Sequence, residues 1–113
     1  MPRRILVADD EKAVRDMLKD VLASEGYEVE TVIDGLQALE NLTKKPYDLA
    51  LLDVGMPGMD GYHVAEQISS RQGYRAKIVI LTGRDIATDS SQAILSGADA
   101  FLEKACEIGR AHV

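Results

Sequence analysis

Short apolar runs alternate with segments of helical periodicity along the whole chain. The first run, RILVA at 4–8, is continuous and rich in branched side chains, which is typical of a strand buried on both faces. The second, YEVETV at 27–32, alternates apolar residues with acids, as an edge strand does. Strands are predicted at 4–8, 27–32, 47–53, 77–82 and 99–104.

Between these runs, apolar residues recur at the three- and four-residue spacings of one helix face. The stripe in 11–24 ends before Gly26, a residue type that commonly terminates helices. Asp60 is the expected N-cap of the third helix, since its carboxylate can accept a backbone N–H of the first turn. Gly35 and Gly61 lie beside helix starts, where we attribute glycine to its backbone freedom. Helices are predicted at 11–24, 34–45, 60–71 and 88–97, the last one shorter and weaker.

This alternation implies a parallel sheet with helices on both faces and right-handed crossovers. With the strand order 2-1-3-4-5, such an open sheet binds ligands outside the carboxyl ends of its strands. After Lys104 only nine residues remain, whereas an average helix has about 11–12 residues. We therefore expect one domain over residues 1–113, with a fifth helix that is short or missing, an atypical, truncated tail at 104–113, and one sheet face partly bare.

The composition is that of a globular domain. Its 113 residues are 46% apolar, which is enough for a hydrophobic core. The net charge of −6 argues against non-specific binding to nucleic acid or to an anionic membrane surface. Cys106 is the one cysteine, so no internal disulfide is expected, and no Cys/His cluster indicates zinc. The sequence shows no secretory signal and no apolar stretch near the roughly 20 residues of a membrane span, so we expect a soluble, cytoplasmic protein.

Acids, a hydroxyl and an ammonium group follow the predicted strands at their carboxyl ends. These residues are Asp9, Asp10, Asp53, Thr82 and Lys104. Two carboxylates about 5 Å apart repel by roughly 3 kcal/mol at an effective dielectric near 20, so such a cluster needs a cation. Oxygen ligands suit Mg²⁺ (or Mn²⁺). An aspartate, a metal ion and a lysine at one edge favour phosphoryl transfer to the carboxylate, which forms an aspartyl-phosphate.

Four motifs occur in a characteristic order, namely ILVADDE, LLDVGMPGMDG, ILTG and GADAFLEK. Each motif is weak alone, but the ordered set resembles the receiver domain of bacterial two-component response regulators over residues 4–104. The resemblance implies a flavodoxin-like, doubly wound α/β fold with five parallel strands in the order 2-1-3-4-5.

The resemblance also implies roles at a phosphorylation site. Asp53 matches the phospho-acceptor, which takes a phosphoryl group from the phosphohistidine of a partner kinase. Asp10 matches the direct ligand of the metal ion, and Asp9 the acid that helps to hold this ion through water. Gly55 matches the position whose backbone carbonyl completes the metal site.

Three further residues match groups that respond to phosphorylation. Thr82 matches the switch hydroxyl that bonds a phosphoryl oxygen, and Lys104 the lysine that pairs with the phosphoryl group. Phe101 matches the aromatic residue that turns inward when the threonine moves, with a simple core aromatic as the alternative. The groups expected to take part in the chemistry are thus Asp53, Thr82 and Lys104.

The chain departs from the family pattern at Ala105, where receivers usually have a proline after a cis peptide bond. A cis bond before a residue other than proline costs about 2.5–4 kcal/mol, so we expect a trans bond or a re-routed loop after Lys104. Two functions remain. The first is a Mg²⁺-dependent signalling switch that changes its protein-interaction surface on phosphorylation. The second is a receiver-like adaptor that is poorly or not phosphorylated and acts only through protein contacts.

The resemblance implies a sensor histidine kinase or phosphotransfer protein as donor, and an output domain or protein as target. We expect no direct contact with nucleic acid or membrane, and a homodimer is left open. The chain is not expected to be an enzyme beyond self-phosphorylation and slow autodephosphorylation. A phosphatase with a DxDx[TV] loop is disfavoured because Gly55 replaces its second aspartate. A flavin site is disfavoured because acids, not a phosphate-binding loop, follow the first strand.

Overall fold

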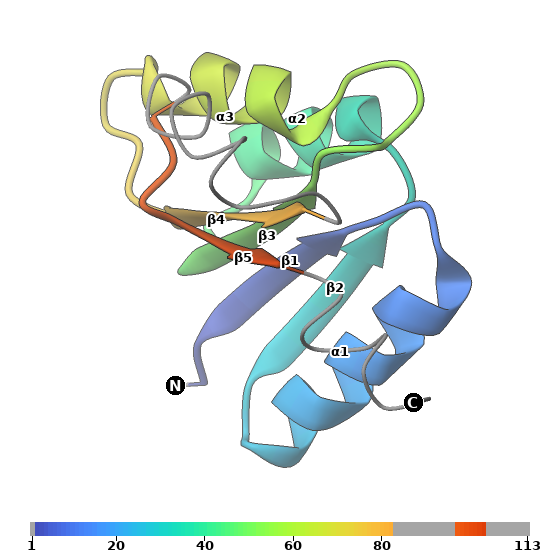
Figure 1. The fold of residues 1–113 in the computed structure, drawn as a ribbon. Coiled ribbons are helices and arrows are strands. Elements are labelled where there is room, and N and C mark those ends of the chain that lie inside the picture. Colours follow the sequence, from blue (N-terminus) through green and yellow to red (C-terminus); the bar gives the residue numbers. More distant parts are fainter. Residues whose placement is uncertain (1, 83–96, 104–113) are drawn as a thin grey trace.

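The computed structural model of the protein describes residues 2–82 and 97–103 (Figure 1). Within these ranges, strands and helices alternate as the sequence predicts. The elements are β1 (Arg4–Ala8), α1 (Lys12–Ser24), β2 (Glu28–Val32), α2 (Gly35–Lys44), β3 (Leu49–Asp53), α3 (Gly61–Ser69), β4 (Lys77–Thr82) and β5 (Ala100–Glu103). The helix predicted at 88–97 lies, except for its last residue, outside the described residues, as does the tail at 104–113.

The strands form one parallel sheet in the order β2-β1-β3-β4-β5, which confirms the predicted topology. β2 is an edge strand, as its alternating pattern indicates. β1 pairs with β3 so that Ala8 lies opposite Leu52, and β3 pairs with β4 so that Asp53 lies opposite Leu81. The carboxyl ends of the strands therefore meet at one edge of the sheet, where the residues that follow them gather.

Helices cover both faces of this sheet, with α2 and α3 on one face and α1 on the other (Figure 1). Side chains alternate between the two faces along β1. Leu6 and Ala8 join the core under α2 and α3, while Ile5 and Val7 join a smaller core under α1. All four side chains are buried, which explains why this strand has a continuous apolar run instead of an alternating one.

Aspartates cap two of the helices. Asp34 accepts the Gln37 N–H at 2.8 Å at the start of α2, and Asp60 accepts the His63 N–H at 2.9 Å at the start of α3. The N-cap predicted at Asp60 is therefore confirmed. Glu11 occupies the N-cap position of α1 but makes no side-chain cap bond, so other groups hold the start of this helix.

The expected bare sheet face concerns the side covered by α1. Leu102 of β5 lies opposite Leu81, which belongs to the core under α1, and Leu102 is 43% exposed. Because residues 104–113 lie outside the described part of the chain, the short or missing fifth helix stays a prediction.

Candidate functional site

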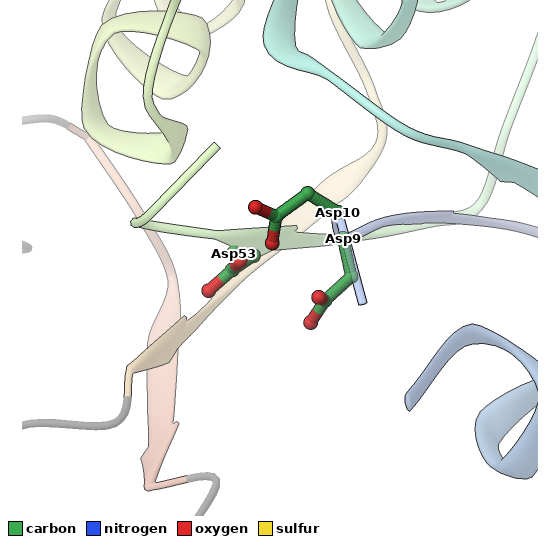
Figure 2. Close-up of side chains that lie close together, drawn as sticks. All are labelled: Asp9, Asp10 and Asp53. Carbon is green, nitrogen blue, oxygen red and sulfur yellow. The ribbon is translucent and has the colours of Figure 1, made fainter. Parts of the chain in front are cut away.

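The carboxyl edge of the sheet brings together three aspartates from two paired strands. Asp53 is the last residue of β3, and Asp9 lies one position beyond the Ala8–Leu52 pair of β1 and β3. One carboxylate oxygen from each of Asp9, Asp10 and Asp53 lies within 4.8 Å of the other two, and Figure 2 shows the three groups around one space. Asp9 and Asp53 are buried, with 0% and 3% exposure, whereas Asp10 is exposed.

Three carboxylate oxygens at this spacing form a donor set that fits a hard divalent cation. Two negative charges 4.8 Å apart repel by about 3.5 kcal/mol at an effective dielectric near 20, and a cation between them reverses the sign of that interaction. Oxygen-only donors suit Mg²⁺, and the exposure of Asp10 leaves room for the waters that Mg²⁺ retains. The structure thus places the three predicted metal-binding aspartates where one ion could contact all of them.

Three hydrogen bonds, to β2, to α1 and to the residue just before α1, hold the turn that contains Asp9 and Asp10. The Asp9 N–H donates to the Val32 carbonyl at 3.2 Å, which extends the pairing of β1 with β2 by one residue. Asp9 Oδ1 accepts the Glu11 N–H at 2.9 Å, and the Asp9 carbonyl accepts Arg15 Nη1 at 2.9 Å. Asp9 is therefore anchored through its amide, its carbonyl and its side chain.

Three glycines lie against Asp53 or the loop that follows it, and two of them, Gly35 and Gly61, are closely packed. A Cβ added at Gly55 would lie 3.9 Å from Asp53 Oδ2, so the Gly55 backbone runs beside this carboxylate. A Cβ at Gly61 would lie 2.6 Å from the Asp53 carbonyl oxygen, and one at Gly35 would lie 1.8 Å from the Met59 carbonyl oxygen. Neither Gly35 nor Gly61 has a positive φ. The expectation of backbone freedom was therefore wrong at these two positions, where lack of space requires glycine.

The residues predicted to respond to phosphorylation come from the other half of the sheet. Thr82 ends β4, one position beyond the Asp53–Leu81 pair, and is fully buried. Phe101 lies on β5, half-buried, and packs against the core under α2 and α3. Lys104 lies outside the described residues, so its pairing with the acids and the bond to Ala105 stay predictions.

Arg15 is a residue near the site that the sequence pattern does not single out. Its periodicity places it among the polar positions of α1, between apolar residues of the stripe. A signal that could have found it is a basic residue one helical turn after Glu11, on a helix that opens directly behind two acids. Such a side chain can reach back to the turn in front of the helix.

A five-stranded 2-1-3-4-5 sheet with an acidic cluster at its carboxyl edge defines a flavodoxin-like α/β domain with a candidate cation site. The sequence matches the response regulator receiver domain family over residues 5–112, and the chain belongs to this family. The resemblance carried by the four motifs is thereby confirmed. Receiver domains are generally not classical enzymes. Within the described residues, no helix combines the length and the apolar character that crossing a membrane requires.

Relatives and solved structures agree with this assignment. The chain is 41% identical over 104 residues to the response regulator MprA of Mycobacterium sp. (strain KMS), a match that covers 92% of the chain and 45% of MprA. The chain thus spans about half the length of the curated relatives it matches. The chemotaxis response regulator CheY4 of Vibrio cholerae has 30% identity and a TM-score of 0.86, with 92% of this chain and 88% of CheY4 covered. The response regulator TrrA of Thermotoga maritima, in complex with Mg²⁺–BeF, has 34% identity and a TM-score of 0.80, with 97% and 96% covered.

Proposed function

We propose that this domain is a signalling switch driven by Mg²⁺-dependent phosphorylation of Asp53. The observation that supports this most directly is the convergence of Asp9, Asp10 and Asp53, with one oxygen of each within 4.8 Å of the others. A second support is the complex of TrrA with Mg²⁺–BeF, since TrrA shares 34% identity over nearly the whole chain. Mn²⁺, with a similar preference for oxygen ligands, is the alternative ion.

The phosphoryl donor in this proposal is the phosphohistidine of a sensor histidine kinase or of a phosphotransfer protein. A carboxylate oxygen of Asp53 forms the new P–O bond while the P–N bond breaks, and the imidazole leaves with the bonding electrons and takes up a proton. A Mg²⁺ ion held by the three aspartates and the Gly55 carbonyl would supply neutralisation of charge on the transferring oxygens. Because Asp53 is the last residue of β3, the donor approaches it at the carboxyl edge of the sheet.

The response to phosphorylation involves residues on and beyond β4 and β5. A phosphoryl group adds about −1.5 to −2 charge and new acceptor oxygens, which the Thr82 hydroxyl and the Lys104 ammonium group bind. Movement of Thr82 toward the phosphoryl group opens space beside β4, and Phe101 turns into that space. Because Phe101 lies half-buried at the edge of the core, its turn changes the surface that β4 and β5 offer to a partner.

The partners follow from this sequence of events. A histidine kinase or phosphotransfer protein docks at the acidic edge, and an output domain or a separate output protein reads the altered surface. This exchange takes place in the cytoplasm through protein contacts, without direct binding of nucleic acid or membrane by this domain. A second copy of the chain is one partner that the altered surface could accept.

A receiver-like adaptor is the second candidate, and one observation favours it. Ala105 follows Lys104 where receivers usually have proline, and the trans bond expected there redirects the lysine. A lysine aimed away from Asp53 leaves the phosphoryl oxygens less well neutralised, which slows phosphorylation. Protein contacts alone would then be the function.

Intact-mass measurement of the purified chain tests the proposal. The chain is first incubated with acetyl phosphate, either in MgCl₂ or in EDTA. We expect the wild type to gain a phosphoryl group only with Mg²⁺, and Asp53→Asn to gain none. Asparagine matches aspartate in shape but is not a nucleophile, so it is the matched control. NMR of Phe101 with beryllofluoride reports the conformational response separately. A wild type that stays unmodified and does not respond to beryllofluoride would support the adaptor.

A further inference from the structure

The start of α1 is held by an arrangement that differs from those of α2 and α3. Glu11 at its N-cap position makes no side-chain cap bond, in contrast to the aspartate caps of α2 and α3. Instead, the Glu11 N–H donates to Asp9 Oδ1 at 2.9 Å. Arg15, in the helix, donates from Nη1 to the Asp9 carbonyl at 2.9 Å in a partly buried position. The start of α1 is thus bonded to the turn that contains two of the three clustered acids.

We propose that Arg15 is a positioning residue for the cation site, an inference that rests on the proposed function. The Asp9 carbonyl belongs to the peptide group that joins Asp9 to Asp10. Because a peptide group is planar, a hydrogen bond that fixes its carbonyl also fixes the plane from which the Asp10 backbone continues. Arg15 therefore sets the direction of Asp10.

Asp10 depends on this support more than its two neighbours in the cluster do. Asp9 and Asp53 are buried and confined by their surroundings. Asp10 is exposed, and its carboxylate makes no hydrogen bond or ion pair within residues 2–82 and 97–103. Its direction before an ion binds is consequently set by its backbone, which Arg15 holds through the preceding carbonyl.

The charge of Arg15 acts in the opposite sense to its hydrogen bond. A guanidinium group close to a cation site repels Mg²⁺, so loss of the charge alone would tighten Mg²⁺ binding. Loss of a group that orients a ligand weakens metal binding, typically by about 10- to 100-fold for residues behind the direct ligands. The two roles therefore predict changes of opposite sign.

Titration of the full chain with MgCl₂, followed by ¹H–¹⁵N NMR at the amides of Asp10 and Gly55, measures the Mg²⁺ dissociation constant. Arg15→Ala is expected to weaken binding about tenfold or more, and Arg15→Lys, which keeps the charge and one donor group, to weaken it less. Lys19→Ala is the matched control, because Lys19 is an exposed cation one helical turn further along α1. Lys19→Ala also removes one positive charge but leaves the hydrogen bond to Asp9 in place, so the Mg²⁺ dissociation constant is expected to change less than about twofold.

Two further readouts separate positioning from general destabilisation. The Asp10 amide belongs to the peptide group held by Arg15, so its resonance is expected to shift in Arg15→Ala in EDTA, without any metal. Urea unfolding establishes that each variant is folded under the titration conditions. Arg15→Ala with unchanged or tighter Mg²⁺ binding would overturn the positioning role while leaving Asp53 phosphorylation intact. A wild type that binds no Mg²⁺ would overturn the proposed function and this inference with it.

Discussion

Substitution of Gly35 by alanine tests the contact between the start of α2 and the loop that follows Asp53. A Cβ at this position would lie 1.8 Å from the Met59 carbonyl oxygen and 2.6 Å from its carbonyl carbon. Real Cβ atoms essentially never approach heavy atoms of residues that are not their chain neighbours closer than 3.0 Å. The helix start and the loop must therefore separate by about 1 Å, and the obstacle is backbone, which cannot rotate away as a side chain can.

The expected cost follows from two opposing terms. Overpacking of this kind costs about 1–3 kcal/mol, and a backbone obstacle places it at the upper end. Alanine recovers less than about 1 kcal/mol of helix propensity, because Gly35 is the first residue of α2. We expect Gly35→Ala to lower the free energy of unfolding by about 2–3 kcal/mol, which corresponds to a fall in Tm of roughly 10 °C for a chain of this size.

Urea unfolding followed by circular dichroism, in EDTA, measures this change without any contribution from bound metal. Gly73→Ala is the matched control, because Gly73 has φ +82° but nothing within 4 Å of an added Cβ. The strain of a left-handed backbone alone costs about 1–2 kcal/mol. A loss for Gly35→Ala no greater than 0.5 kcal/mol would refute the reasoning, since it would mean that α2 and the loop separate freely.

The remaining predictions concern two tyrosines and the acidic cluster. Burial, together with the hydrogen bond to Glu30, raises the pKa of Tyr47 from 10.0 to about 12. The contribution of Tyr47 to the free energy of unfolding is therefore fully present below pH 10 and is lost as the pH rises to 12. Tyr47→Phe is expected to lower the free energy of unfolding by about 1–2 kcal/mol at neutral pH and to remove the Tyr47 part of the decrease at alkaline pH; the same alkaline slope in urea unfolding of both proteins would contradict this. The Tyr74 hydroxyl is buried without a hydrogen bond in the described part of the chain, so Tyr74→Phe should leave the unfolding free energy unchanged or raise it by up to about 1 kcal/mol; a clear fall in Tm would count against this. Mg²⁺ at about 100 times its dissociation constant is expected to stabilise the wild type by about 2.7 kcal/mol and Asp10→Asn by much less, and equal thermal shifts would place the ion elsewhere.

Most of the fold could be predicted from the sequence because its signals are local. The continuous run at 4–8 reproduces the bounds of β1, and the aspartate cap predicted at residue 60 is present at the start of α3. The ends of other elements shifted for non-local reasons. β3 begins at Leu49, two residues later than predicted, where its pairing with Ile5 of β1 begins, and no local pattern marks where a partner strand starts.

The aspartates of the candidate site could also be predicted from local signals. Asp9 and Asp53 follow apolar runs, and a parallel sheet brings the ends of such runs to one edge. The residues that support the site were not predictable in the same way. The position of Gly35 beside a helix start suggests backbone freedom, whereas the structure shows that the carbonyl of Met59 leaves no room for a side chain. No local pattern predicts the role of Arg15, because its bond to Asp9 depends on how α1 is oriented relative to the end of β1.

The sequence by itself determined which of the described segments become strands and helices, the parallel direction of the strands, and which chemical groups stand at the strand ends. These properties follow from side-chain periodicity and residue type, which are recorded locally along the chain. Only the tertiary structure decided that one carboxylate oxygen from each of Asp9, Asp10 and Asp53 lies within 4.8 Å of the other two. It also decided that Arg15 bonds to the turn after β1 and that Gly35 packs against the loop after β3. Contacts of this kind depend on strand register and helix packing between distant residues, where a shift of about 1 Å changes which atoms meet.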